Sequence, residues 1–522
     1  VNMSFLLYLF ACYIFLVSEN EAARILAVFP TPSISHQVVF RPLTQELAKR
    51  GHEVTVITTD PVFKNVGSPP NLTEIDVHDI SYNIWIENFI KSESRGNKND
   101  LKSQLDIFMY TFAKVFEAQI QTDEVQTILS DKKRKFDLLF IEACNRPALG
   151  LSHVYKDVPV ILVSSLGAVP GNYEVIGAAT HPLLYPNVFR QRIYNLTMSE
   201  KITEMYNHYQ SEISFRNNVE VENGVLRKAF GPDVPSVEDL SKNVDMLFLN
   251  INPIFEGIRP VPPSVIYMGG LHLKPEKDLP AELKNYLDSS KHGVIYFSFG
   301  TNVAPSMLPP ERIAIFTKVF SQLPYDVLWK WDKDELPGRS DNVRISKWLP
   351  QSDLLRHPKV KLFITQGGLQ STDEAIVAGV PLIGFPILAD QWFNVEKYVH
   401  FNIGLQLDLA TVTEEKLLNA INTAIGDVSF RRNIEKLRDV MHDQPQKPLE
   451  RAVWWTEYVL RHGGAKHLRS PAANISWAEY LELELVFTLL AGIFAVIFVF
   501  LGSIYLLYKK LTSSVSKKPK RS

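Results

Sequence analysis

The sequence predicts an α/β protein with two parallel-sheet halves and one membrane-spanning helix near its carboxyl end. Three observations support this prediction. Strand-like and helix-like segments alternate from residue 25, a second series of strand-like segments starts at residue 294, and residues 485–508 carry no charge. With 522 residues, of which 46% are hydrophobic, the chain can bury the cores of two ordinary domains.

The first half opens with a strand, a helix and a strand joined by short turns. Residues 25–29 read as a buried strand, apolar positions at helical spacing predict a helix over residues 35–50, and residues 54–58 form the next strand. This order is typical of a parallel sheet with crossover helices. Residues 136–142 and 158–164 continue the pattern. Aromatic-rich helical segments such as FMYTFAKVF and YNHYQ either line a pocket or simply pack.

A stretch rich in Pro, Gly and Lys, residues 260–279, separates the two halves. Five strands are predicted after it, at residues 294–299, 327–331, 343–346, 362–365 and 382–385. The aromatic-rich segment at residues 442–467 has a helical pattern and leads toward the membrane.

The two ends of the chain carry apolar segments of different length. Residues 5–17 suit the apolar core of a signal peptide, with a retained anchor or a buried segment as the alternative. As a helix, residues 485–508 would span roughly 36 Å at about 1.5 Å per residue, enough to cross a membrane. Glutamates precede this run and lysines follow it, so the short tail is expected in the cytosol and the bulk of the chain on the other side.

Other signals in the sequence concern the compartment. Asn71, Asn195 and Asn474 begin sequons and are candidate N-glycosylation sites on a lumenal surface. Lys518 and Lys520 resemble a dilysine signal for retrieval to the endoplasmic reticulum, although a generic basic stop-transfer tail is the alternative. We therefore expect a single-pass type I protein of the endoplasmic reticulum membrane with lumenal domains.

Charge and cysteine content exclude several classes of function. The 55 basic and 57 acidic residues leave a net charge of -2, so no global basic field favours nucleic acid. Cys12 lies in the predicted signal peptide, and Cys144 is the other cysteine. The mature chain is therefore expected to have neither an intramolecular disulfide nor a cysteine metal site.

Two strand ends in the second half carry residues suited to a ligand, because ligands of open α/β sheets bind at the carboxyl ends of strands. At the first, Gly300 permits close backbone approach, and Thr301 and Asn302 offer donors. At the second, Trp348 can stack on a base while Gln351 hydrogen-bonds its edge.

The third strand end begins the segment FITQGGLQSTDEAIVAGVPLIGFPILADQ at residues 363–391. Gly367 and Gly368 lie where a strand turns into a helix, and the amides of a helix N-terminus favour a phosphate or diphosphate. Gln366 and Gln370 can donate hydrogen bonds to it, and Ser371 belongs to the same candidate set.

Acidic residues complete this candidate site. Glu374 lies on about the same helix face as Gln370 and can accept hydrogen bonds from paired ribose hydroxyls. Asp390 and Gln391, at the end of the next strand, can bind the hydroxyls of a sugar. Together, the three strand ends describe a nucleotide-sugar pocket.

The same segment resembles the signature of UDP-glycosyltransferases. The matching positions are Gln366, Gly367, Glu374, Pro381, Pro386, Asp390 and Gln391. WLPQSDLLRHP, YMGGLHLKP, HDQPQKPLERAVWW and GAKHLR extend the resemblance over nearly the whole chain, and TQGGLQSTDEA looks most like the insect members. Many relatives have His at the position of Gln366; a neutral amide here leaves the diphosphate more dependent on backbone amides.

The resemblance implies a GT-B fold, in which two Rossmann-like domains face each other. The implied segments are a signal peptide (1–22), an acceptor-binding domain (23–270), a UDP-sugar-binding domain (271–440), a helical segment returning toward the first domain and the membrane (441–484), a transmembrane helix (485–508) and a cytosolic basic tail (509–522). No metal or other cofactor is expected, because the UDP-sugar is a co-substrate; a homo-oligomer is possible.

The resemblance also implies inverting transfer with a histidine base at the start of the first helix. That position is His36, and imidazole titrates near neutral pH, as a general base requires. The alternative is that His36 only caps or packs the helix start. Glu142 takes the place of the aspartate that orients the base in vertebrate relatives, unless the partner lies elsewhere or no acid is used. Asp137 is assigned to a buried strand start.

We therefore expect a hexosyltransferase that moves a sugar, with UDP-glucose favoured as donor, to a hydroxyl of a small lipophilic acceptor. Such an activity suits detoxification or the conjugation of hormones and pigments. A UDP-glucuronosyltransferase with the same mechanism is one alternative. A catalytically silent homologue that binds a UDP-sugar or a lipophile is the other.

Overall fold

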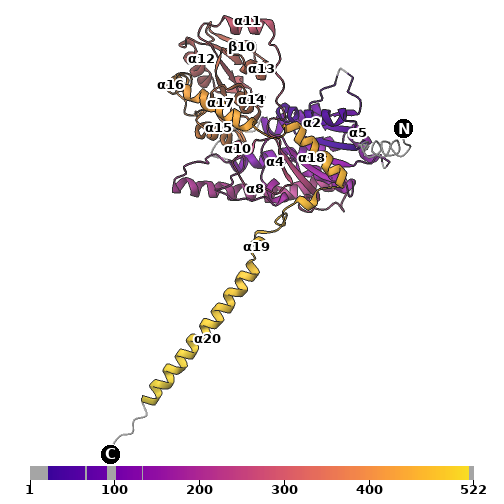
Figure 1. Ribbon diagram of the computed structural model, residues 1–522, viewed down its shortest axis with the longest axis vertical. Coiled ribbons are helices and arrows are strands. Elements are labelled where there is room, and N and C mark those ends of the chain that lie inside the picture. The colour runs from indigo at the N-terminus through magenta and orange to yellow at the C-terminus, as the bar shows by residue number, and fades with distance from the viewer. Residues whose placement is uncertain (1–21, 65–66, 91–100, 132, 516–522) are drawn as a thin grey trace, which may run out of the picture. The chain divides into compact units, whose positions relative to one another are not determined.

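The structure is a computed structural model and describes residues 22–64, 67–90, 101–131 and 133–515 (Figure 1). Two compact units are present, one up to Ser470 and one from Pro471 onward. The predicted signal peptide, up to residue 21, and the dilysine signal lie outside the described residues.

The first half of the chain forms a seven-stranded parallel sheet in the order β3-β2-β1-β4-β5-β6-β7. Its strands are β1 (Arg24–Phe29), β2 (Glu53–Thr58), β3 (Leu72–Asp76), β4 (Leu138–Glu142), β5 (Val160–Ser164), β6 (Val244–Leu249) and β7 (Val265–Tyr267). In register, Ala27 of β1 lies opposite Val56 and Phe140. The central strands are almost continuously apolar because helices cover both faces of a parallel sheet.

Helices and short turns connect these strands. They are α2 (Ile34–Lys49), α3 (His78–Trp85), η1 (Ile86–Ile90), α4 (Leu101–Ile120), α5 (Asp123–Ser130), η2 (Arg146–Gly150), α6 (Leu151–Val154), α7 (Asn172–Ile176), α8 (Met198–Phe230), α9 (Val237–Leu240), η3 (Ser241–Asn243) and α10 (Pro253–Glu256). The long helices α4 and α8 pack against each other.

The second half forms a six-stranded parallel sheet in the order β10-β9-β8-β11-β12-β13. Its strands are β8 (Val294–Ser298), β9 (Asp326–Lys330), β10 (Val343–Ser346), β11 (Val360–Thr365), β12 (Leu382–Gly384) and β13 (Gly404–Gln406). Its helices and short turns are α11 (Ala281–Ser289), η4 (Pro305–Met307), α12 (Pro310–Ser321), α13 (Gln351–Leu355), α14 (Leu369–Ala378), α15 (Gln391–His400), α16 (Glu414–Gly426) and α17 (Val428–His442). Aromatic side chains fill much of this core, with Trp329 stacked on Phe297.

The chain then returns to the first half through α18 (Pro448–His462) and η5 (Lys466–Leu468). Ala452 and Val453 of α18 belong to the same buried cluster as Val39 and Leu43 of α2. Figure 1 shows α18, in the orange of late residues, against the indigo elements of the first half. The first sheet is thus covered on one face by a helix from the far end of the chain.

Each sheet has one point where the strand order reverses. In the first sheet the chain passes from β1 out to β3 and then back to β4 on the other side of β1. In the second it passes from β8 out to β10 and back to β11. Loops diverge at such a point and leave a crevice at the carboxyl ends of the strands. The ends of β1, β4, β8 and β11 are therefore where a ligand site is expected.

The second unit contains α19 (Trp477–Tyr480) and α20 (Leu483–Val515). Within the described part of the chain, α20 is the one helix whose length and apolar composition suit a membrane span. This finding agrees with the predicted span at residues 485–508, and the two parallel sheets confirm the predicted α/β fold class.

Candidate active site

His36 and Glu142 meet at the reversal point of the first sheet. His36 lies in the first turn of α2, which follows β1, and Glu142 is the last residue of β4. The distance from His36 Nδ1 to Glu142 Oε1 is 2.7 Å, and the Thr31 backbone N–H donates to Glu142 Oε2 at 3.0 Å. A carboxylate only accepts, so Nδ1 donates and Nε2 keeps its lone pair for a proton.

Burial distinguishes the two members of this pair. The Glu142 side chain is 1% exposed and the His36 side chain 16% exposed, so the carboxylate is enclosed while the imidazole reaches a cavity. Asp137, in contrast, does not lie where it was predicted. The strand begins one residue later, and the Asp137 side chain is 44% exposed beside Arg24, so the prediction of a buried position was wrong.

Cys144 stands close to the same pair. The ligand atoms of His36, Glu142 and Cys144 lie within 4.8 Å of one another. Burial raises the pKa of the Cys144 thiol well above its ordinary value, and its sulfur is 3.3 Å from Thr31 Oγ1. A thiol held in its protonated form is a poor metal ligand. The expectation of a metal-free site stays a prediction.

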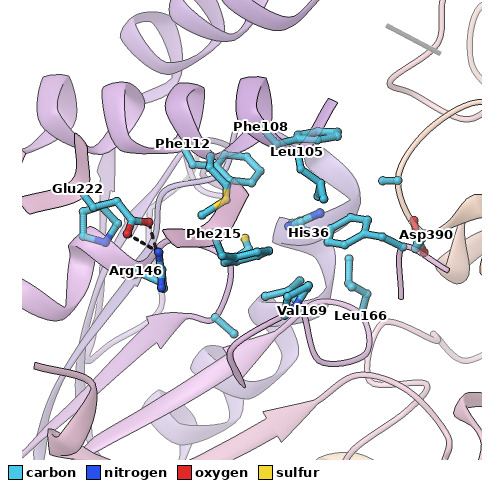
Figure 2. A pocket seen from close by; sticks show the side chains of 17 residues that line it. His36, Leu105, Phe108, Phe112, Arg146, Leu166, Val169, Phe215, Glu222 and Asp390 are labelled. Atoms are coloured by element: carbon cyan, nitrogen blue, oxygen red, sulfur yellow. Dashed lines mark hydrogen bonds and ion pairs between the residues drawn. The ribbon is translucent and has the colours of Figure 1, made fainter. Parts of the chain in front are cut away.

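An apolar cavity extends from His36 into the first half (Figure 2). Its walls come mainly from α4, α8 and the loop after β5, through Leu105, Phe108, Met109, Phe112, Leu166, Val169 and Phe215. It encloses about 100 Å³. An apolar cavity of about 150 Å³ holds a benzene ring, so this smaller space admits an aromatic acceptor only if side chains of its wall move.

The end of the signature segment lies at the His36 end of this cavity. Asp390 and Ala389 line it, and Ala389 has φ +48°, a left-handed backbone that is uncommon for a residue other than Gly. Asn394, one turn later on α15, donates to Asp390 Oδ2 at 2.7 Å and to the Gly367 carbonyl at 2.9 Å. Burial raises the pKa of Asp390 to about 6. Asn394 was not predicted as a site residue.

Gln391 and Gln370 make contacts that fix their loops. Gln391 Oε1 accepts hydrogen bonds from the backbone N–H groups of Ile387 and Leu388, both at 2.8 Å. Gln370 Nε2 donates to the Ser165 carbonyl of the first half at 2.9 Å. Both side chains therefore shape the edge of the cleft, and their predicted contacts with a ligand stay predictions.

The predicted glycines lie at the N-terminus of α14. Gly368 is the residue before the helix, and Gly367 has φ +93°. A Cβ on Gly367 would lie 2.4 Å from Val395 Cγ2, and a Cβ on Gly300 would lie 2.5 Å from Gln366 Nε2. At Gly367 the buried Val395 side chain leaves no room for a Cβ, whereas at Gly300 the Gln366 side chain could move and the backbone angle φ of +71° is what favours glycine. The amides at the start of this helix face the same reversal point as Gly300.

Gln366 is almost completely buried behind this turn, with 7% of its surface exposed. Its Oε1 is buried and has no hydrogen-bond partner among the described residues. An unpaired buried polar atom is costly unless a ligand or water satisfies it. The predicted contact of Gln366 with a ligand stays a prediction.

Glu374, Gln351 and Ser371 form one hydrogen-bonded cluster. Gln351 Nε2 donates to Glu374 Oε2 at 2.7 Å and to Ser371 Oγ at 2.9 Å, while Tyr296 OH donates to Gln351 Oε1 at 2.9 Å. Burial raises the pKa of Glu374. Gln351 thus orients the Glu374 carboxylate. The other oxygen of Glu374 has no partner within the described part of the chain. The predicted contact of Gln351 with a base stays a prediction.

Trp348 lies at the surface beside this cluster, with 66% of its area exposed. Lys330, at the end of β9, places its ammonium 4.9 Å from the centre of the Trp348 ring and donates to the Gly300 carbonyl at 2.8 Å. Burial lowers the pKa of Lys330. Lys330 was missed by the sequence analysis, because it lies inside the strand predicted at residues 327–331 and its contact with Gly300 is tertiary.

The remaining predicted residues at this edge are Thr301 and Asn302. Thr301 is exposed, and Asn302 Nδ2 lies 3.4 Å from Ser33 Oγ, just before the helix that carries His36. The two halves thus touch where the candidate catalytic and donor-binding residues gather. The sequon residues lie elsewhere: Asn71 and Asn195 are exposed and Asn474 is partly buried.

Two parallel sheets, each with a reversal point at which candidate site residues gather, have the architecture of the GT-B fold. Solved structures agree: the chain superposes on the glycotransferase of kitacinnamycin with a TM-score of 0.55, 17% identity and coverage of 85% of this chain and 99% of that one. It superposes on glycosyltransferase VinC in complex with dTDP with a TM-score of 0.55, 15% identity and coverage of 84% of this chain and 99% of that one. These likenesses confirm the predicted GT-B fold.

Sequence comparison specifies the family. Residues 24–518 match the family described as UDP-glucoronosyl and UDP-glucosyl transferase, and the chain belongs to it. The ecdysteroid UDP-glucosyltransferase of Spodoptera littoralis nuclear polyhedrosis virus is 37% identical over 501 residues, 92% of this chain and 96% of the relative. UDP-glucosyltransferase 2 of Dactylopius coccus is 32% identical over 95% of each chain. Human UDP-glucuronosyltransferase 2B15 is 31% identical over 98% of each. The chain is therefore a glycosyltransferase that uses a UDP-sugar.

Proposed function

We propose that this enzyme transfers glucose from UDP-glucose to a hydroxyl of a small lipophilic acceptor, with His36 as the general base. The observation that carries the proposal is the shared cavity: His36 and Asp390, one from each half, line the same end of an otherwise apolar space. An acceptor held there presents its hydroxyl to the imidazole and to the sugar at once. Positioning of this kind is a large part of catalysis.

The chemical step follows from these positions. The acceptor oxygen attacks the anomeric carbon, its proton passes to His36 Nε2, and the bond from that carbon to the diphosphate oxygen breaks with inversion. Glu142, 2.7 Å from Nδ1, stabilises the imidazolium that forms. The leaving diphosphate gains negative charge as the bond breaks, and the amides at the start of α14 stabilise it.

The donor is held mainly by the second half. Trp348 stacks on the uracil, Glu374 accepts from the ribose hydroxyls, and Gln366 contributes its neutral amide near the diphosphate. Asp390 binds sugar hydroxyls. UDP-glucose is preferred over UDP-glucuronic acid, the second candidate donor, because the viral relative named as a UDP-glucosyltransferase is 37% identical to this chain and the human UDP-glucuronosyltransferase 31%.

The anchor places the enzyme beside its substrates. Lipophilic acceptors dissolve in membranes, and α20 suits a single membrane span. With the basic tail in the cytosol, the two sheets and the sequons would lie in the lumen of the endoplasmic reticulum. Conjugation to a sugar there makes an acceptor more water-soluble, as detoxification or hormone conjugation requires.

The test is release of UDP by the purified full-length enzyme in detergent. Phenolic acceptors are combined with UDP-glucose, UDP-glucuronic acid and UDP-N-acetylglucosamine, and His36→Ala is assayed beside the wild type. We expect turnover that is fastest with UDP-glucose and a loss of at least a hundredfold in the variant. If UDP binds but no pair turns over, the protein is a silent binding homologue. If His36→Ala keeps full activity, His36 is not the base.

A further inference from the structure

The far end of the apolar cavity carries an ion pair that the proposed chemistry does not use. Arg146 Nη2 is 2.5 Å from Glu222 Oε2, and Arg146 Nε donates to Glu222 Oε1 at 3.1 Å. Figure 2 shows this pair at the opposite end of the cavity from His36 and Asp390, with Phe112 and Phe215 between them.

Secondary structure holds both members in place. Arg146 opens the turn η2, four residues after Glu142 at the end of β4, and Glu222 lies in the last third of α8. The Arg146 guanidinium also lies 5.5 Å from the centre of the Phe215 ring. Two N–H groups on two carboxylate oxygens leave little rotational freedom, so the guanidinium has one defined orientation.

Stability alone does not account for this pair. The Glu222 side chain is 5% exposed, and its burial raises its pKa despite the nearby arginine. Ion pairs buried in this way commonly contribute no more than apolar residues of the same volume would. A charged pair inside a wall of phenylalanine and leucine therefore points to recognition of a ligand.

The guanidinium still has a donor to offer. Nε and Nη2 are taken by Glu222, whereas Nη1 makes no hydrogen bond with any described residue, and the side chain lines the cavity with 22% of its area exposed. Both Glu222 oxygens accept from Arg146. The cavity end therefore presents N–H donors, with the charge of the guanidinium offset by the adjacent carboxylate.

We propose that Arg146, oriented by Glu222, is a specificity-determining residue that binds an uncharged oxygen at the end of the acceptor remote from the reacting hydroxyl. The inference rests on the proposed function, because it takes this cavity as the acceptor site. The substrates it selects are elongated aromatic or alicyclic alcohols with a carbonyl, ether or hydroxyl oxygen at the far end. A far-end carboxylate is disfavoured, since Glu222 already neutralises the arginine and a second anion would meet its charge.

The test uses pairs of phenols that differ only at the remote group. 4-Hydroxyacetophenone, 6-acetyl-2-naphthol and 4-acetyl-4′-hydroxybiphenyl each carry a ketone at increasing distance from the phenol. The partner of each replaces the acetyl group by isopropenyl, which has the same shape and no oxygen. For the length that spans the cavity, we expect kcat/KM to favour the ketone by about ten- to a hundredfold, the range of a hydrogen bond to a charged donor.

The variant pair separates recognition from folding. Arg146→Met combined with Glu222→Met replaces the ion pair by apolar side chains and leaves no buried charge alone. Arg227→Met combined with Glu220→Met removes an exposed ion pair of the same helix, 2.7 Å apart, and serves as the control. We expect the first variant to lose the ketone preference, measured as the ratio of the two kcat/KM values within each pair of phenols. The control should keep the preference.

Equilibrium binding makes the outcome independent of turnover. Calorimetry of the same ketone and isopropenyl pairs, with UDP present, measures their affinity for wild type and variants even if no sugar is transferred. Failure of transfer with a retained ketone preference in binding would overturn the proposed function and leave this inference standing. A preference that is absent at all three lengths, or that survives in the Arg146→Met and Glu222→Met variant, would overturn the inference.

Discussion

Replacing Glu142 by Gln removes one charge from the candidate active site without changing its shape. The carboxylate now accepts from two donors, His36 Nδ1 at 2.7 Å and the Thr31 N–H at 3.0 Å. An amide has one acceptor and one donor, and therefore cannot satisfy both contacts. If its oxygen faces Thr31, its NH2 group forces His36 to carry its proton on Nε2. If its oxygen faces His36, two N–H groups oppose each other at Thr31.

The first orientation is favoured, because the Glu142 side chain is 1% exposed and an unsatisfied backbone N–H there costs about 1–3 kcal/mol. In that orientation Nε2 is protonated and cannot take the acceptor's proton. Loss of positioned general base catalysis corresponds to about 10²–10⁴ in rate. At about 1.4 kcal/mol per tenfold, this equals roughly 3–5 kcal/mol of transition-state stabilisation.

The assay is the initial rate of UDP release at saturating donor and acceptor. Circular dichroism and thermal unfolding verify that the variant is folded, and Glu142→Asp, which keeps the charge on a shorter side chain, is the matched control. We expect kcat to fall for Glu142→Gln with KM for the donor unchanged, and a smaller loss for Glu142→Asp. A folded Glu142→Gln enzyme with more than half of the wild-type kcat would refute the role of this carboxylate.

Three further predictions concern the second half. Burial raises the pKa of Asp390 to about 6, so its carboxylate loses its charge below that pH. The donor KM of the wild type should therefore rise below pH 6, whereas that of Asp390→Asn should not. Parallel plots of KM against pH for the two enzymes would contradict this prediction. Burial raises the pKa of Asp373 to about 8, so the folded state binds this proton more tightly than the unfolded state and the unfolding free energy falls as pH rises from about 4 to 8. Tm measured at pH 5, 6.5 and 8 should therefore fall less steeply with pH in Asp373→Asn than in the wild type. An equal slope of Tm against pH in the two proteins would argue against this role of Asp373. Trp348→Leu should raise the donor KM about tenfold with Tm unchanged, because stacking is lost from a side chain that is 66% exposed; an unchanged KM would exclude the stack.

The strands of both sheet centres were predictable because they are long apolar runs. Four strands were missed: β3, β6, β7 and β13. Leu72–Asp76 is an edge strand with charged residues, and Val265–Tyr267 and Gly404–Gln406 have three residues each, too short to show a period. Val244–Leu249 is fully buried and was hidden by the aspartate that interrupts its apolar run.

Candidate site residues could be predicted from the sequence where they follow closely after a predicted strand. The rule that ligands bind at carboxyl ends of strands located Gly300, Gln366 and Asp390, and the resemblance placed His36 beside Glu142. The contact between Arg146 and Glu222 was not predictable, because 76 residues separate them and α8 shows no apolar stripe that would indicate which of its faces is buried. Lys330 and Asn394 act through tertiary contacts, which periodicity does not reveal.

The return of α18 to the first sheet also has a consequence for the order in which the chain folds during synthesis. The apolar face of α2 that receives Ala452 and Val453 is translated some 400 residues before its cover. A ribosome produces about 5–20 residues per second, so this surface waits roughly 20–80 seconds for its cover. Because α20 follows α18 within about 20 residues, α2 receives its cover only shortly before the membrane segment is synthesised.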